Sequence, residues 1–179
     1  TRQFSDDEWP LGCSDTGDLA VEANSQLLSV AREHSVPIVY VRGLGPDELF
    51  DMQSGRVSKS TGNYDPGEGN TIRQEIAPRE GDIVIEKPRR SAFFGTRLES
   101  LLNEHGIDTL IVTGMVTSGC IRATVVDAFE RDYRVIVPPE CVADRGQVSH
   151  QVTLFDIDMK FGDVTPLEDV STTIRERYV

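Results

Sequence analysis

Short apolar runs rich in β-branched residues alternate along this chain with longer segments whose apolar residues recur at helical spacing. The runs lie at 37–41, 82–87, 108–115 and 133–139, and the helical segments at 18–34, 96–106, 119–133, 148–162 and 166–178. A run without polar alternation belongs to a strand covered on both faces, as in parallel sheets with crossover helices. The pattern predicts an α/β fold, a three-layer α/β/α sandwich around a central, mostly parallel sheet.

Local signals refine the helix expected over 96–106 and add one short strand. Thr96 followed by Glu99 has the spacing of a capping box, and Gly106 is the residue type that ends many helices. A short strand is expected over the DVT triplet at 163–165, between the last two helices.

The chain has 179 residues and no change in composition that would mark a domain boundary, so we expect a single domain over 1–179. Residues 43–81 differ from the rest, with seven glycines, three prolines and little periodicity. A segment of this length without its own secondary structure is typical of a lid or an oligomer contact.

Charge and hydropathy limit the class of partner. The formal net charge is −12, whereas nucleic acids and anionic membranes bind basic patches. With no run of 18 apolar residues and no signal-peptide pattern, we expect a cytoplasmic protein with a small-molecule partner. Only three of the 18 basic residues are lysines, which is typical of halophiles and of high-GC genomes.

The sequence gives little support for a disulfide framework, a bound metal, a dinucleotide or a triphosphate. The three cysteines, Cys13, Cys120 and Cys141, form no C-x-x-C pair, which favours a reduced compartment with at most one functional thiol. No G-x-G-x-x-G or Walker A pattern opens a helix, and the histidines are scattered without metal-ligand spacing.

Ligands of open α/β sheets bind beyond the carboxyl ends of the strands, where this sequence has Arg42, Lys87, the segment 114–120 and Arg145. The segment 114–120 leads in a tight turn to Cys120 at a helix N-terminus. There the helix dipole and free N–H groups favour a thiolate, the form that attacks carbonyl carbons. The alternative interpretation is a cysteine that packs in the core.

Two basic residues lie at the same predicted edge. Lys87 ends a buried strand in a chain that otherwise prefers arginine, which suggests a compact ammonium near a reacting centre. Arg145 offers a guanidinium suited to a substrate carboxylate. The alternatives are a strand-end lysine that extends to solvent and a surface ion pair between Arg145 and Asp144.

Longer motifs resemble a known family. The segments VIEK, SAFFGT and VTGMVTSGCIRATVVDAFERDYRVIVPPECVADR are similar to those of the isochorismatase-like cysteine hydrolases. The tail LFDIDMKFGDV resembles the branch that contains N-carbamoylsarcosine amidase and maleamate amidohydrolase.

The resemblance implies Cys120 as nucleophile and Lys87 as its activating cation. It also implies a cis peptide between Met115 and Val116, so that the amides of Val116 and Cys120 form an oxyanion hole.

In the amidase branch, the resemblance further implies that Arg145 binds the substrate carboxylate, with Thr117 and Phe93 beside the substrate. It implies that no cofactor is needed and that the protein forms a homodimer or homotetramer.

One family feature is not found. The third catalytic residue is an aspartate at the end of the first, central strand, five positions before an aromatic residue that Phe4 matches, so it would precede Thr1 by two positions. Asp6 and Asp7 do not match it. We expect that this strand lies outside the printed sequence and that its two neighbours have unpaired backbone groups.

The expected activity is hydrolysis of a small carboxylated amide or ureido compound, of the N-carbamoylsarcosine or maleamate type, with ammonia released through a thioester. A nicotinamidase-type amidase is disfavoured because VRGLGPDE replaces that branch's metal-binding set. Isochorismatases proper and their phenazine-pathway relatives are disfavoured because they need no cysteine. A non-catalytic homologue, acting as a binding or assembly subunit, remains an alternative because of the absent aspartate.

Overall fold

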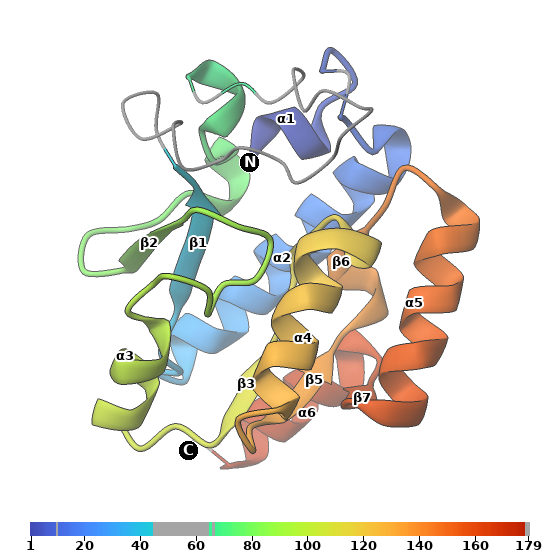
Figure 1. The fold of residues 1–179 in the computed structure, drawn as a ribbon. Helices are drawn as coiled ribbons and strands as arrows, with labels where there is room; N and C mark the ends of the chain where they lie inside the picture. The colour runs from blue at the N-terminus through green and yellow to red at the C-terminus, as the bar shows by residue number, and fades with distance from the viewer. Residues whose placement is uncertain (10, 45–64, 66, 178–179) are drawn as a thin grey trace.

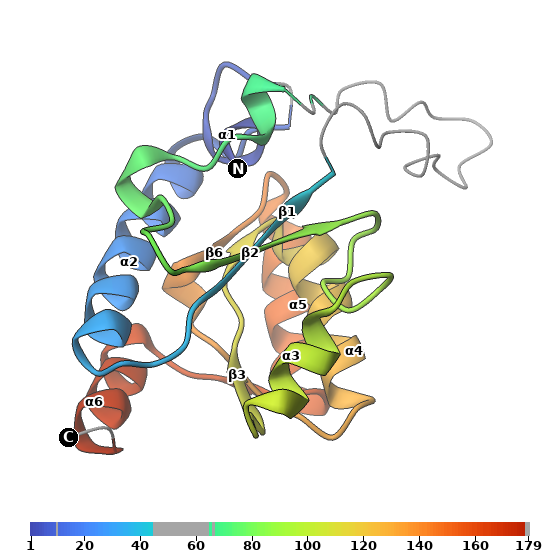
Figure 2. The same cartoon turned by 90° about the vertical axis from the view of Figure 1, so that its left-hand side faces the viewer.

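The computed structural model describes residues 1–9, 11–44, 65 and 67–177. Two groups of helices enclose the strands (Figures 1 and 2). On one side lie α2 (Ser14–Glu33) and α6 (Leu167–Arg177), and on the other lie α3 (Leu98–Glu104), α4 (Arg122–Phe129) and α5 (Gln147–Lys160). No helix in the described residues is long and apolar enough to cross a membrane.

All paired strands run parallel, which confirms this part of the prediction. The strands are β1 (Val39–Gly43), β2 (Ile83–Lys87), β3 (Thr109–Ile111), β4 (Gly114–Met115), β5 (Arg134–Val137), β6 (Val142–Ala143) and β7 (Asp163–Val164). The pairs are β1 with β2, β3 with β5, β5 with β7, and β4 with β6.

The pairing differs from the single central sheet that the sequence predicts. Within the described ranges the strands form three separately hydrogen-bonded sheets. Among these residues β1 pairs only with β2, and β3 pairs only with β5. The expectation that a first strand lies outside the printed sequence stays a prediction.

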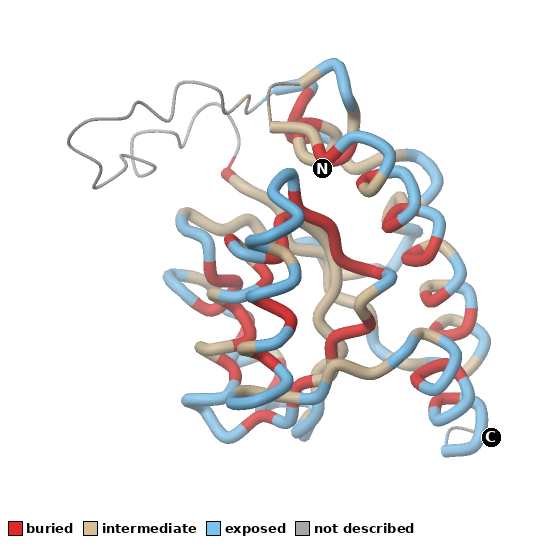
Figure 3. The backbone as a smooth tube through the Cα atoms, turned by 90° about the vertical axis from the view of Figure 1, so that its right-hand side faces the viewer, coloured by how far each residue is buried: buried red, intermediate tan, exposed pale blue. Residues whose placement is uncertain are grey.

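Apolar residues from both helix groups pack against the strands. The larger core cluster includes fully buried side chains of α4, α5 and β5, namely Val125, Ala128, Ile157 and Val137. A second cluster joins α2 to α6, through Leu27, Val30, Val170 and Ile174. The buried stretches of these helices turn towards the strands (Figure 3).

The prediction of one strand over 108–115 is wrong, because the structure divides it. β3 ends at Ile111, and β4 begins at Gly114, whose φ of +114° is accessible to glycine at little cost. The break lets β4 pair with β6 instead of β5.

The prediction of a capping box from Thr96 to Glu99 is also wrong. The Thr96 hydroxyl donates to the carbonyl of Ala92 (2.6 Å) and accepts from the amide of Leu98 (3.2 Å), and α3 begins only at Leu98. Gly106, with φ +63°, follows the end of this helix as expected.

Several short elements complete the described part of the chain. They are α1 (Arg2–Ser5), the 3₁₀ turns η2 (Glu68–Asn70), η3 (Gln74–Ile76) and η5 (Pro139–Cys141), and the π-helical turn η4 (Thr117–Ile121). The expected lid or contact over 43–81 falls mostly on residues 45–64 and 66, which lie outside the described residues. Within 67–81, η3 packs against α2.

Candidate active site

Cys120 lies in the turn that connects β4 to α4. The peptide between Met115 and Val116 is cis, as the resemblance implies. The π-helical turn Thr117–Ile121 follows and leads directly into α4. Cys120 is partly exposed, whereas Cys13 and Cys141 are buried.

Lys87, the last residue of β2, places its ammonium against this sulfur. Its Nζ lies 3.3 Å from Cys120 Sγ and also donates to the carbonyls of Arg89 (2.8 Å) and Arg90 (2.9 Å). These three acceptors match the three N–H groups of an ammonium. A cation held beside a sulfur stabilises its thiolate, so the pair has the arrangement of an activated nucleophile.

The residues after the cis peptide are fixed by packing and by a hydrogen bond. Val116 packs in a small buried cluster with Cys13, Ala20 and Ala143. Thr117 is fully buried, and its hydroxyl lies 2.9 Å from His150 Nδ1 on α5. Burial lowers the pKa of His150, so its ring is neutral near pH 7.

Asp144, for which the sequence suggested only an ion pair with Arg145, holds the turn that carries Cys120. Its Oδ2 accepts from the amide (2.8 Å) and the hydroxyl (2.6 Å) of Ser118, and its Oδ1 accepts from the amide of Gly146 (3.3 Å). The side chain is buried. Asp144 comes directly after β6, and that strand has only two residues, too few to show a pattern in the sequence.

Arg145 follows Asp144 at the same edge, because β4 and β6 are parallel neighbours. Its side chain reaches the carbonyl of Leu11, at 2.9 Å. Among the described residues the structure records no ion pair between Arg145 and Asp144. The alternative interpretation of Arg145, a surface ion pair with Asp144, is therefore excluded.

Two other predicted residues are engaged elsewhere. The Phe93 ring is buried in the core, 5.8 Å from the ring of Tyr133 and 5.1 Å from the guanidinium carbon of Arg131. Arg42 forms a two-pronged ion pair with Glu86, through Nε (3.0 Å) and Nη2 (2.7 Å). The structure therefore brings together Lys87, Cys120 and the turn before it, and gives Phe93 the contacts of a core residue.

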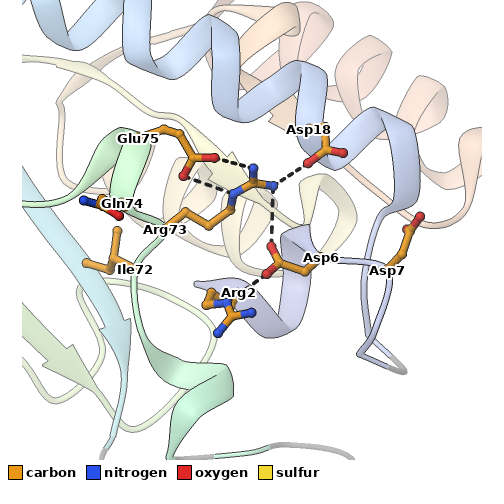
Figure 4. Close-up of a pocket in the computed structure, with 8 residues that line it drawn as sticks. All are labelled: Arg2, Asp6, Asp7, Asp18, Ile72, Arg73, Gln74 and Glu75. Carbon is orange, nitrogen blue, oxygen red and sulfur yellow. Dashed lines mark hydrogen bonds and ion pairs between the residues drawn. The ribbon is translucent and has the colours of Figure 1, made fainter.

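A cavity of about 540 Å³, whose lining includes neither Lys87 nor Cys120, lies between α1, α2 and η3. It is lined by Arg2, Asp6, Asp7, Asp18, Ile72, Arg73, Gln74 and Glu75 (Figure 4). Arg73 pairs with Asp6, Asp18 and Glu75, so the charges here satisfy one another. The strand-end group, which has a nucleophile and a cation, is the better candidate active site.

The described residues contain no group of three or more His, Cys, Asp or Glu side chains that could hold a metal ion. The segment VRGLGPDE at 41–48, which bears on the nicotinamidase interpretation, extends beyond Leu44 into residues outside the described part.

Alkylation distinguishes the three thiols. Burial raises the pKa of Cys13 to about 11 and that of Cys141 to about 12, so both remain neutral and inaccessible near pH 7.5. We expect brief treatment with iodoacetamide to modify Cys120 first, as measured by peptide mass spectrometry. All three should react after unfolding in urea. Equal modification of the three in the native protein would contradict the assignment of Cys120 as the reactive thiol.

Comparison with known proteins identifies the family of the chain. The family model described as the isochorismatase domain matches residues 8–169. The chain belongs to the isochorismatase family. The resemblance stated from the motifs is thereby confirmed.

The curated relatives in this family include amidohydrolases. Maleamate amidohydrolase of Pseudomonas putida is 39% identical over 159 residues, which cover 87% of this chain and 75% of that protein. N-carbamoylsarcosine amidase of Arthrobacter sp. is 50% identical over 99 residues, 55% of this chain and 38% of the relative. The second match therefore spans less than half of that protein.

Solved structures of the isochorismatase family have the same fold. A cysteine hydrolase from Pseudomonas syringae pv. phaseolicola superposes with a TM-score of 0.87 at 26% identity, covering 99% of this chain and 89% of that one. N-carbamoylsarcosine amidase from Thermoplasma acidophilum has a TM-score of 0.72 at 28% identity, covering 88% and 87%.

Proposed function

We propose that this chain is a cysteine-dependent amidohydrolase that acts on a small carboxylated amide or ureido compound and releases ammonia. The observation that carries the proposal is the 3.3 Å contact between Lys87 Nζ and Cys120 Sγ. The names of the relatives support it, because maleamate, N-carbamoylsarcosine and ureidoacrylate each combine an amide or ureido group with a carboxylate.

The reaction proceeds in two halves. The Cys120 thiolate forms a bond to the carbonyl carbon, and the π electrons move onto the oxygen, which backbone amides of Val116 and Cys120 stabilise. The C–N bond then breaks as the nitrogen takes up the proton that the Cys120 thiol gave up on ionising, leaving ammonia and a thioester, or a thiocarbamate when the substrate is a ureido compound. Water attacks the thioester, and the acid and the free thiol are released.

Arg145 is the residue we assign to the substrate carboxylate. It follows β6 at the same edge as Cys120, and one of its five N–H groups donates to the carbonyl of Leu11. The planar guanidinium can present two parallel N–H groups to a carboxylate, which an ammonium cannot do.

An ammonia-release assay over matched substrates tests both parts of the proposal. The panel contains maleamate, N-carbamoylsarcosine and ureidoacrylate, each beside its uncharged methyl ester. We expect activity on at least one carboxylated member. In Arg145→Lys, KM for that substrate should rise by the equivalent of about 1–3 kcal/mol, the net worth of charged hydrogen bonds, while the ester changes little.

Arg145→Ala should raise KM further, and Arg175→Lys, an exposed position on α6, serves as the matched control. Equal loss on the charged and uncharged substrates would make Arg145 a structural residue that anchors Leu11. The absence of ammonia release over the whole panel would favour a binding or assembly role.

A further inference from the structure

The end of β2 and the loop that follows it carry the densest positive charge in the sequence. The segment KPRR at 87–90 holds three basic residues in four positions, and Arg89 and Arg90 are the only two basic residues that are adjacent in the chain. A chain with a net charge of −12 repels anions at long range. A group of cations beside Cys120 offsets that repulsion at the place where an anionic substrate would bind.

Arg90 lies against the turn that carries Cys120. Its carbonyl accepts from Lys87 Nζ at 2.9 Å, and that nitrogen is 3.3 Å from Cys120 Sγ. Its guanidinium reaches Gly119, where a side-chain Cβ would lie only 3.1 Å from Arg90 Nη1 and 3.0 Å from Val116 Cγ2. Because Gly119 has no side chain, the guanidinium can lie directly beside the residue that precedes the nucleophile.

The Arg90 side chain is exposed, and it makes no hydrogen bond or ion pair with any of the described residues. Two other arginines near the site are engaged: Arg89 donates to the carbonyl of Pro88 (2.9 Å), and Arg145 donates to that of Leu11 (2.9 Å). The five N–H groups of Arg90 are therefore available to a ligand. A planar guanidinium binds a carboxylate through two parallel N–H groups.

The guanidiniums of Arg90 and Arg145 approach this turn from different sides. The carboxylate of the residue before Arg145 accepts from the amide and the hydroxyl of Ser118. The ammonium that the Arg90 carbonyl holds lies instead beside Cys120. Residues two positions apart in a helical turn project in nearly opposite directions. Two guanidiniums placed in this way suit a substrate with two acidic groups, one on each side of the reacting carbonyl.

We propose that Arg90 is a specificity-determining residue that binds a second carboxylate of the substrate. The preferred substrate class is then the amide or ureido derivatives of dicarboxylic acids. Arg145 binds one carboxylate and Arg90 the other, with the carbonyl carbon held at Cys120 Sγ between them. The inference rests on the proposed function for the role of Arg145 and for the reacting group. The Arg90 contact itself is a binding interaction that can be measured without turnover.

Protection of Cys120 from brief treatment with iodoacetamide measures this contact. The probes are N-carbamoylaspartate and N-carbamoylglutamate, which have two carboxylates, and N-carbamoylalanine, which has one. We expect at least one dicarboxylate to protect the unaltered protein at a concentration about 10-fold or more below that of the monocarboxylate, the usual effect of charged hydrogen bonds. Arg90→Gln should abolish this advantage. Arg90→Lys should lose most of it, because an ammonium cannot form the two-pronged contact.

Arg175→Gln, at an exposed position on α6, is the matched control and should keep the advantage of the dicarboxylates. The Arg90 variants retain the backbone carbonyl that accepts from Lys87. The probes are compared within each variant, so a change in the reactivity of the thiol does not affect the comparison.

The absence of a dicarboxylate advantage in the unaltered protein, or an equal weakening of all three probes in Arg90→Gln, would overturn the inference. Full retention of the advantage in Arg90→Lys would overturn the two-pronged contact. Ammonia release from maleamate without any dicarboxylate advantage would refute the inference and leave the proposed function in place. An advantage that depends on Arg90, in a protein that releases no ammonia from any substrate, would refute the proposed hydrolysis and leave the binding contact.

Discussion

Cys120→Ala is expected to reduce kcat/KM on every active member of the substrate panel by at least about 10³-fold. Removal of the sulfur eliminates the covalent intermediate, and what remains is the contribution of binding and of the oxyanion-stabilising amides. The expected signature is uniform, since carboxylated and uncharged substrates both need the nucleophile. Ammonia release in steady state measures the loss, and mass spectrometry of the quenched reaction should detect an acyl adduct only in the unaltered protein.

Cys141→Ala is the matched control. Cys141 is fully buried between α2 and α6 and has no role in the proposed reaction. We expect nearly full activity, with a loss of stability of about 1 kcal/mol from the small cavity, visible as a lower Tm. Retention of substantial turnover in Cys120→Ala would exclude the thioester mechanism.

Lys87→Ala is expected to lower kcat by about 10²- to 10³-fold, the usual cost of removing one preorganised charged donor from an active site. The loss should be equal for charged and uncharged substrates, in contrast to Arg145→Lys. Without the ammonium at 3.3 Å, the thiolate loses its nearest cation among the described residues, and the carbonyls of Arg89 and Arg90 lose a shared donor.

Alkylation of Cys120 separates an effect on the sulfur from a general disturbance. In Lys87→Ala the rate of Cys120 alkylation should fall near pH 7, because the cation 3.3 Å from the sulfur has been removed. Arg134→Ala, which removes an exposed cation from β5, should leave that rate unchanged. An unchanged alkylation rate at pH 7 in Lys87→Ala would show that the lysine does not act on the thiolate.

Two features could be predicted because their causes are local. They are the parallel α/β class and the strand ends that carry Lys87 and lead to Cys120. The run VIV at 135–137 is apolar on both faces, with Val135 and Val137 in one core cluster and Ile136 packed against the other, and the requirement to cover both faces determines the surrounding layers. The tight turn to Cys120 has its own sequence of small residues. Such signals depend on neighbours within a few positions.

The elements that the sequence did not predict depend on distant contacts. The strand β6 has only two residues, and it forms because it pairs with β4. In this pairing Val142 lies opposite Gly114, which is 28 positions earlier in the sequence. The Thr96 hydroxyl was expected at the helix start and instead donates to Ala92, because α3 begins two residues later. His150 was dismissed as scattered, since nothing local connects it to Thr117.

The two adjacent residues that follow β6, Asp144 and Arg145, make different contacts. Asp144 turns inward and holds Ser118, while Arg145 is exposed and reaches Leu11. Because the carboxylate of Asp144, and not the guanidinium of Arg145, contacts the turn that carries Cys120, a substitution of Arg145 removes no hydrogen bond from that turn. Under the proposed function, a substitution at position 145 therefore changes the binding of the substrate and leaves the position of the Cys120 sulfur unchanged.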